Sequence, residues 1–346
     1  MNKIILRADG GGQIGLGHIY RLLALSEMLK DSFQCLFVIR PVDQLIQDLI
    51  RNFCELYVLE DSTNGSEIEQ LLKLLSPKDC LILDGYQFDI DYQLSVKKNH
   101  NFLVVIDDLC DKPFAADLII NHGKRGIEKQ YQVTAPTKIL TGLQYLILRQ
   151  EFLRVAKRDR TVTSVENIFI CFGGSDPYGL TVKGVKASLA SALFKTIVVV
   201  TGAGYKDVHE LANLVSEFPE TILHRNNVEA AELSELMQNC QVALSTASTI
   251  ALELCCVRMG LITTVVVQNQ ELLYSELQDN GCSVGIKDVY QSTVEELSQI
   301  IRKVADPEVV QSLIANQRRV FDGRSGDRIS NILKNSITEH AQTNNR

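Results

Sequence analysis

Apolar segments of strand length alternate along this chain with segments in which apolar residues recur at the period of a helix. Strand-like runs of the first half lie at residues 3–9, 34–40, 55–60, 80–85, 102–108 and 117–122. A second series lies at residues 167–174, 194–202, 221–225, 241–248, 260–267 and 282–286. Continuous hydrophobicity is typical of strands covered on both faces, so each series predicts a mostly parallel sheet between helices.

The stretch 149–166 is polar and basic, and it predicts the connection between two domains. A chain of 346 residues with 45% hydrophobic content can form two cores of ordinary size. We therefore predict two Rossmann-like, doubly wound α/β domains at residues 1–150 and 151–335, followed by a polar tail at 336–346 that frays. Ligands of such sheets bind at the carboxyl ends of the strands, so we expect the site there, in a cleft between the domains.

Charge and composition exclude several classes of function. The formal net charge of −7 opposes a general affinity for nucleic acid. No apolar run approaches the roughly 20 residues that span a bilayer, and the chain opens on a strand pattern rather than a basic and apolar leader. The nine cysteines include no CxxC pair, which favours reduced structural thiols. We expect a cytoplasmic monomer without stable membrane association.

The segment "RADGGGQIGLGHIYR", residues 7–21, places glycines between a strand-like and a helix-like run. Its glycines satisfy the dinucleotide-binding pattern G-x-G-x-x-G, with Gly10, Gly12 and Gly15. Asp9 argues against this interpretation because its carboxylate would lie beside a pyrophosphate. An NADP-binding turn that uses Arg40 stays open as an alternative.

A second interpretation of this loop centres on His18. Gly15 and Gly17 bracket a turn that lets a ligand approach the backbone, and the helix N-terminus offers unpaired N–H groups. His18 is expected in the first turn, where the positive helix end disfavours the imidazolium and keeps a neutral ring that can accept a proton. A histidine that only caps the helix or packs is the alternative.

The segment "CFGGSDPYGLT", residues 171–181, repeats this arrangement in the second domain. A strand ends in Gly173 and Gly174, and Ser175 or Asp176 can cap a helix that Pro177 opens. Backbone N–H groups at such a turn bind a diphosphate without basic side chains. The plain alternative is a capped strand-to-helix turn.

Two further segments of the second domain offer polar groups at strand ends. In "LSTASTIALELC", Ser248 or Thr249 can cap a helix, and Glu253 follows one turn later, where a carboxylate can accept both ribose hydroxyls. Asn269 and Gln270 follow the next apolar run and can contact diphosphate or sugar. A helix N-cap is the alternative for Asn269.

Acidic and aromatic residues end two strands of the first domain. Asp107 and Asp108 are adjacent, so their side chains point to opposite faces and lack the D-x-D spacing that holds a metal against a diphosphate. Their roles stay open. Tyr86 follows Asp84 at another strand end, where its hydroxyl can hold the sugar or a water, or simply pack.

Together these motifs resemble the UDP-2,4-diacetamido-2,4,6-trideoxy-β-L-altropyranose hydrolases of pseudaminic acid biosynthesis, which are similar to the glycosyltransferase that makes lipid II. "IGLGHIYR", "LILDGY", "VVIDDL", "ADLIIN", "CFGGSDPYGLT", "STASTIALE" and "NQ" occur in the order of that family and span nearly the whole chain. The sequence departs from the family at "GGG" (10–12) and at "STAST", where members often carry extra glycine.

The resemblance implies a GT-B-like fold, no metal or other cofactor, and hydrolysis of a UDP-sugar by C–O cleavage with inversion. It implies His18 as the base on water, Glu253 as the ribose contact, and a nucleotide surrounded by "GGSD" and "STAST". We assign catalysis to His18 and Tyr86. The expected substrate contacts are Asp9, Gly15, Gly17, Arg21, Gly173, Gly174, Ser175, Ser248, Thr249, Glu253, Asn269 and Gln270.

Three other functions remain alternatives to hydrolysis. A transferase would pass the same sugar to an acceptor, although no basic amphipathic segment for a membrane-bound acceptor stands out in the first domain. An NAD(P) oxidoreductase is opposed by Asp9. A nucleotide-sugar sensor would use every pocket residue without turnover.

Overall fold

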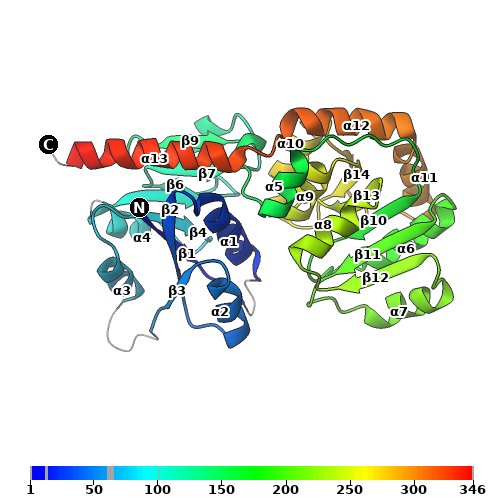
Figure 1. Cartoon of the computed structure of the whole chain (residues 1–346), viewed down its shortest axis with the longest axis horizontal. Helices are drawn as coiled ribbons and strands as arrows, with labels where there is room; N and C mark the ends of the chain where they lie inside the picture. The colour runs from blue at the N-terminus through cyan, green and yellow to red at the C-terminus, as the bar shows by residue number, and fades with distance from the viewer. Residues whose placement is uncertain (1, 12–14, 61–65, 100, 345–346) are drawn as a thin grey trace. The chain divides into compact units, whose positions relative to one another are not determined.

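The computed structural model describes residues 2–11, 15–60, 66–99 and 101–344. It divides into two compact units (Figure 1). Unit 1 comprises Met1–Gln150 and Arg324–Arg346, and unit 2 comprises Glu151–Gly323. The chain therefore passes between the units twice, once near residue 150 and again near residue 323.

Unit 1 is built on a seven-stranded sheet whose strands are all parallel. In spatial order the strands are β3 (Glu55–Val58), β2 (Phe33–Ile39), β1 (Asn2–Ala8), β4 (Cys80–Asp84), β5 (Phe102–Ile106), β7 (Leu118–Asn121) and β9 (Lys138–Thr141). Its helices are α1 (Gly17–Leu29), α2 (Gln44–Arg51), α3 (Glu67–Leu74), α4 (Ile90–Lys97) and α13 (Ser325–Asn344). The short strands β6 (Pro113–Phe114) and β8 (Gln132–Val133) pair separately.

Unit 2 repeats this plan on a six-stranded parallel sheet. The strands are β12 (Ile222–Asn226), β11 (Thr196–Thr201), β10 (Asn167–Cys171), β13 (Val242–Thr246), β14 (Gly260–Thr264) and β15 (Val284–Ile286). The helices are α6 (Leu180–Ser191), α7 (Val208–Glu217), α8 (Ala230–Gln238), α9 (Thr249–Val257), α10 (Glu271–Asp279), α11 (Val294–Val304) and α12 (Pro307–Val320), and α5 (Gln150–Ala156) spans the boundary.

The predicted pair of doubly wound parallel sheets is confirmed. In both units the first strand lies between the second and the fourth, so the strand order reverses beside β1 in unit 1 and beside β10 in unit 2. Loops that leave the sheet at this point diverge and open a crevice at its carboxyl edge. None of the nine cysteines, all of which lie in the described ranges, forms a disulfide bond. Strand β9 was not among the predicted runs, and β14 ends at Thr264, three residues before the predicted end.

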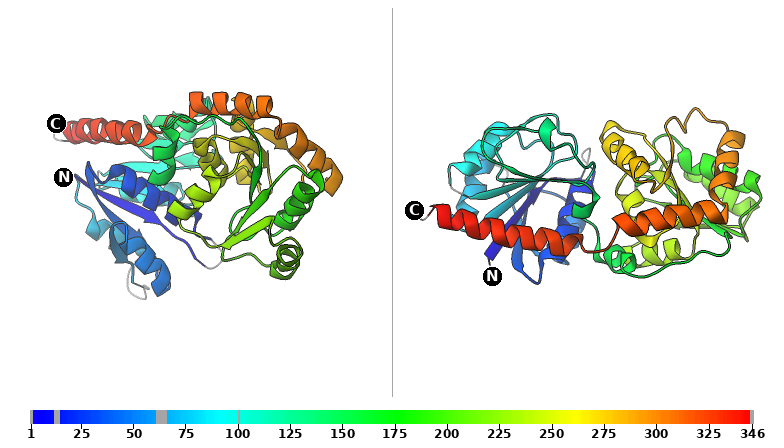
Figure 2. Two further views of the ribbon diagram at one scale, coloured as in Figure 1. Left: turned by 45° about the vertical axis from the view of Figure 1, so that its right-hand side comes forward. Right: turned by 90° about the horizontal axis from the view of Figure 1, so that it is seen from above.

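The end of the chain corrects the prediction of a second domain that continues to residue 335 and a tail that frays. Helix α13 belongs to unit 1, where it contacts α1, and both views of Figure 2 show it alongside this unit. Ile329, Leu333 and Ile337 recur every four residues and are buried. His340, within the predicted tail, packs its ring edge-on against Phe102 at 5.4 Å.

The predicted linker 149–166 also contains structure. Its first part forms α5, in which Phe152 and Leu153 are buried, because the apolar residues of this short segment supply one packing face. Farther along, the guanidinium of Arg160 donates hydrogen bonds to the backbone carbonyls of Gln238 and Val257. Arg160 thus satisfies carbonyl groups at the ends of α8 and α9.

Candidate functional site

Polar side chains of unit 1 gather at the carboxyl edge of its sheet. His18 lies in the first turn of α1 after β1, Asp84 is the last residue of β4, and Asp108 follows β5. His122 follows β7, the next strand of the sheet. Because the strands are parallel, their carboxyl ends meet at one edge, which is where the strand pattern predicts a ligand site.

Arg21 links two of these carboxylates. Its Nε donates to Oδ2 of Asp84 at 2.7 Å and its Nη2 donates to Oδ1 of the same residue at 2.5 Å. Towards Asp108, Nη1 and Nη2 donate over 2.5 and 2.9 Å. Asp84 is fully buried, so this guanidinium is the charge that makes its burial tolerable. One cation facing two anions leaves the group with a net charge of −1.

The pKa of Asp108 reflects this pairing. Burial raises the pKa of Asp108, but the charge and hydrogen bonds of Arg21 outweigh burial, and together with His122 and His18 they lower the pKa to about 2. Asp108 is therefore ionised at neutral pH. We predicted Arg21 as a substrate contact. That contact stays a prediction, whereas the bonds observed here make Arg21 the residue that holds Asp84 and Asp108 in place.

The ring of His18 is oriented by Asp84. Its Nδ1 lies 2.8 Å from Oδ1 of Asp84, and a carboxylate can only accept, so Nδ1 carries the proton. Nη2 of Arg21 is 3.3 Å from the same nitrogen, but two N–H donors cannot bond each other. Nε2 is thereby left as the acceptor. A carboxylate at this distance could also stabilise an imidazolium if Nε2 took a proton, as in Asp–His pairs of hydrolases.

Tyr86 lies beside this pair. Its ring meets the His18 ring edge-on with 5.1 Å between the centroids, and its hydroxyl donates to Oδ2 of Asp108 at 3.4 Å. The side chain is nearly half exposed. Tyr86 is therefore placed next to the predicted base with an accessible surface, and its catalytic role stays a prediction.

The glycine loop brings α1 close to the strand that precedes it. Helix α1 begins at Gly17 after Leu16, whose side chain has no group that could cap the first amides. Gly15 has a φ of +75°, and a Cβ on Gly10 would lie 2.8 Å from the backbone oxygen of Gly15. These two glycines are therefore required by the backbone. Gly12, part of the dinucleotide pattern, lies outside the described residues.

The carboxylate of Asp9 accepts hydrogen bonds from other residues of unit 1. Arg7, itself fully buried, donates from Nη1 and Nη2 over 2.5 and 2.8 Å to its two oxygens, and the backbone N–H of Arg40 donates at 3.1 Å. The substrate contact predicted for Asp9 stays a prediction. The Nε of Arg40, which an NADP interpretation would require, donates to Glu67 at 2.7 Å.

Asp107 and Asp108 face different partners, as the alternation of side chains along a strand predicts. Asp107 accepts hydrogen bonds from the hydroxyl of Tyr131 at 2.8 Å and from the backbone N–H of Cys110 at 2.7 Å. Burial raises its pKa. Within the described part of the chain, no three His, Cys, Asp or Glu side chains converge as a metal site would need.

The first loop of unit 2 follows β10. Gly173 has a φ of +90°, and Ser175 is exposed. The carboxylate of Asp176 accepts from the backbone N–H groups of Leu180 and Thr181 at 3.0 and 2.7 Å. The prediction that Pro177 opens the helix is wrong, because α6 begins three residues later, where Asp176 satisfies its first amides.

This loop also packs closely on the next one. A Cβ on Gly202 would lie 2.5 Å from the Cα of Gly174, so the close packing depends on the absence of a side chain at Gly202. Nothing within 4 Å would meet a Cβ on Gly174 itself. The predicted diphosphate contacts at Gly173 and Gly174 are therefore placed on an open turn and stay predictions.

The second loop of unit 2 follows β13. Ser248 is the N-cap residue of α9, but its side chain does not cap the helix. Its hydroxyl lies 3.0 Å from that of Thr246, and Thr249, the first helical residue, is exposed. The N-terminus of α9 thus presents amides and hydroxyls at the carboxyl edge. Glu253 is only 2% exposed, and its predicted ribose contact stays a prediction.

Asn269 and Gln270 lie between β14 and α10. They belong to a short 3₁₀ turn, Gln268–Gln270, in which Asn269 is exposed. Gln270, rather than Asn269, is the N-cap residue of α10, and its side-chain oxygen accepts from the backbone N–H of Val266 at 2.9 Å. The N-cap alternative for Asn269 is therefore wrong, and its contact with diphosphate or sugar stays a prediction.

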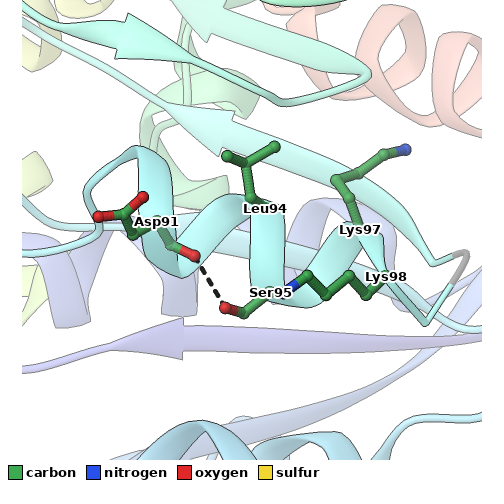
Figure 3. Close-up of a pocket in the computed structure, with 5 residues that line it drawn as sticks. All are labelled: Asp91, Leu94, Ser95, Lys97 and Lys98. Carbon is green, nitrogen blue, oxygen red and sulfur yellow. Dashed lines mark hydrogen bonds between the residues drawn. The ribbon is translucent and has the colours of Figure 1, made fainter.

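A hollow of about 520 Å³ lies elsewhere in unit 1, and Figure 3 shows its lining. All its lining residues come from α4 or its C-cap, namely Asp91, Leu94, Ser95, Lys97 and Lys98. The ammonium of Lys97 is paired with Asp117 at 2.6 Å. Since one helix face supplies the whole lining, the hollow lacks the converging polar groups of a ligand site.

Comparisons with known proteins agree with the motifs. The chain is 26% identical over 296 residues to the UDP-2,4-diacetamido-2,4,6-trideoxy-beta-L-altropyranose hydrolase of Campylobacter jejuni, covering 82% of this chain and 99% of the relative. The resemblance inferred from the sequence is confirmed. The spore coat polysaccharide biosynthesis protein SpsG of Bacillus subtilis is 23% identical, covering 94% and 96% of the two chains. No family model matches the chain.

Solved structures confirm the GT-B-like fold. MurG of Acinetobacter baumannii superposes with a TM-score of 0.66 at 12% identity, covering 97% of this chain and 100% of MurG. UGT2 of Phytolacca americana, solved with UDP-2fluoro-glucose, gives 0.70 at 10% identity, covering 98% and 100%. Among the described residues, no helix combines the length and the hydropathy that crossing a membrane requires.

Proposed function

We propose that this protein hydrolyses a UDP-linked 2,4-diacetamido-2,4,6-trideoxy sugar to UDP and free sugar, by C–O cleavage with inversion, in the biosynthesis of pseudaminic or a related nonulosonic acid. The observation that carries the proposal is the 2.8 Å contact between Nδ1 of His18 and Asp84, which leaves Nε2 of His18 as an acceptor at the carboxyl edge of the sheet. The similarity to the Campylobacter hydrolase supports the choice of substrate.

The reaction needs a base for water and stabilisation of the departing UDP. The water oxygen bonds to the anomeric carbon while the bond from this carbon to the UDP oxygen breaks. Nε2 of His18 takes the proton of the water, and Asp84 stabilises the resulting imidazolium. UDP leaves as a diphosphate and needs no strong general acid. The hydroxyl of Tyr86 holds the sugar or the water.

Unit 2 would hold the nucleotide. The open turn at Gly173 and Gly174 and the N-terminus of α9 offer backbone N–H groups to the diphosphate, which stabilise its developing charge. Glu253 would accept the ribose hydroxyls, with Asn269 and Gln270 near the diphosphate or sugar. Chemistry is thus assigned to unit 1 and nucleotide binding to unit 2.

The decisive experiment follows the reaction by NMR in ¹⁸O-labelled water with the UDP-diacetamido sugar. Hydrolysis as proposed releases UDP without an acceptor, places ¹⁸O in the sugar, and forms first the anomer opposite to that of the substrate. Label in UDP would show P–O cleavage and overturn the mechanism. Binding without release of UDP would favour a sensor.

A His18→Ala variant tests the base. We expect its kcat to fall by about 10²-fold or more, because general base catalysis contributes that much. His209→Ala is the matched control, since His209 is exposed on α7 of unit 2. Equal kcat values for the wild type and the His18 variant would show that His18 is not the catalytic base.

Transfer of the sugar to an acceptor is the second candidate, because the fold is shared with UDP-glycosyltransferases. It would be favoured if UDP release required an added acceptor. The location in the cytoplasm and the monomeric state stay predictions.

A further inference from the structure

His122 is a buried histidine to which the mechanism above gives no role. It follows β7 directly, at the edge of the sheet that also carries Asp84 and Asp108. Its ring is close enough to Arg21, Asp108 and Asp84 for their charges to act on it. His122 therefore belongs to the same cluster as the predicted base, although it is 104 residues away from His18 in the sequence.

The neighbours of His122 are fixed by hydrogen bonds. The side chain of Asn121 donates to the hydroxyl of Tyr131 at 2.9 Å and accepts from the backbone N–H of Gly123 at 2.8 Å. Tyr131 in turn donates to Asp107. With the residues on both sides held in this way, the backbone of His122 has little freedom and its ring is positioned in advance.

One nitrogen of the ring nevertheless lacks a hydrogen-bond partner. His122 is 7% exposed, and its Nδ1 has no hydrogen bond in the described structure. Burial, together with the charge of Arg21, lowers the pKa of His122 to about 4, so the ring is neutral and carries one donor and one acceptor nitrogen. Buried polar atoms of native proteins are nearly always paired, which makes this nitrogen an exception that needs an explanation.

We propose that His122 is a sugar-binding residue, whose ring hydrogen-bonds a polar group of the substrate's diacetamido sugar. This inference rests on the proposed function, because it takes the sugar of that substrate as the ligand. An amide of the acetamido groups offers both an N–H and a C=O, and a neutral imidazole can bond either. A half-turn of the ring about Cβ–Cγ exchanges the places of Nδ1 and Cδ2, so the nitrogen is not confined to its enclosed side.

The test separates binding of the sugar from binding of the nucleotide. Dissociation constants for UDP and for the UDP-diacetamido sugar are measured by calorimetry in a His18→Ala background, which prevents turnover. We expect His122→Leu to weaken binding of the sugar nucleotide by about tenfold, the loss of one neutral hydrogen bond. Binding of UDP stays unchanged. His122→Asn, which keeps a donor and an acceptor, restores affinity to within about threefold.

Equal changes in the two dissociation constants, or none, in a folded variant would overturn the proposal. A measurement without substitution covers the case in which His122→Leu fails to fold. In protein labelled with ¹⁵N-histidine, the ring nitrogens of His122 shift on addition of the sugar nucleotide but not of UDP. An unmoved signal would also overturn the proposal. Binding without hydrolysis by the wild type would refute the proposed function alone.

Discussion

The depressed pKa of His122 predicts how the stability of unit 1 depends on pH. In the folded chain the pKa is about 4, whereas an unperturbed histidine has 6.5. Between these values the unfolded chain binds a proton that the folded chain does not. The free energy of unfolding of unit 1 is therefore highest, as far as His122 is concerned, above pH 6.5. It decreases as the pH falls from 6.5 towards 4.

The size of this effect follows from the shift. Each pKa unit corresponds to about 1.4 kcal/mol, so the whole shift amounts to about 3 kcal/mol. Between pH 7 and pH 5, proton linkage at His122 lowers the free energy of unfolding by about 2 kcal/mol. His122→Asn removes the titrating ring, so the stability of unit 1 in this variant should fall by about 2 kcal/mol less than that of the wild type over this interval.

Methionine oxidation can report the two units separately. Met28 is largely buried in α1 of unit 1, and Met259 is fully buried in unit 2. Peroxide oxidation of each, followed by mass spectrometry along a urea gradient, gives an unfolding midpoint for each unit. Only the Met28 curve should respond differently to pH in His122→Asn. The exposed-site variant His209→Asn should behave as the wild type.

The same loss of stability between pH 7 and pH 5 in the wild type and in His122→Asn would refute the reasoning. It would mean that the ring of His122 meets water or a compensating charge in the folded chain. A difference confined to the Met259 curve would contradict the assignment of the effect to unit 1.

Two further predictions concern one residue in each unit. Asp84→Asn should lower kcat by about 10²-fold or more with a smaller change in KM, because an amide no longer selects the Nδ1–H form of His18 or stabilises its imidazolium. Kinetics at saturating substrate measure kcat, and a change in KM alone would contradict the prediction. Asp176→Ala should lower the free energy of unfolding of unit 2 by about 1 kcal/mol, because α6 loses the carboxylate that caps its first amides. Oxidation of Met259 along a urea gradient measures this loss, and an unchanged Met28 curve is the control.

The sequence predicted the parts of the fold that depend on local pattern. Apolar runs and the turns between them locate most strands, and a strand, a glycine turn and a helix suffice to place His18 in the first turn of α1. The extension of α13 through the predicted tail and its place in unit 1 were not predicted, because its polar surface hides a narrow apolar stripe, Ile329, Leu333 and Ile337. Such a stripe indicates burial only once the surface that it covers is known.

The partners within the site could not be predicted in the same way. Asp84 lies 66 residues from His18, and their contact depends on β4 lying next to β1. The pattern "LILDGY" did contain a signal, since a carboxylate ends a fully apolar strand at the edge where the site was expected. Only the structure shows that the guanidinium of Arg21 binds two carboxylates.

The return of α13 to unit 1 has a consequence for folding during synthesis. A ribosome finishes every strand of unit 2 before it reaches α13, whereas the surface of α1 that this helix covers emerged much earlier. Unit 2 can therefore complete its fold before unit 1, although unit 1 begins the chain. Until α13 is synthesised, the apolar surface of unit 1 that this helix covers stays exposed. Chaperones would bind the nascent chain at this surface.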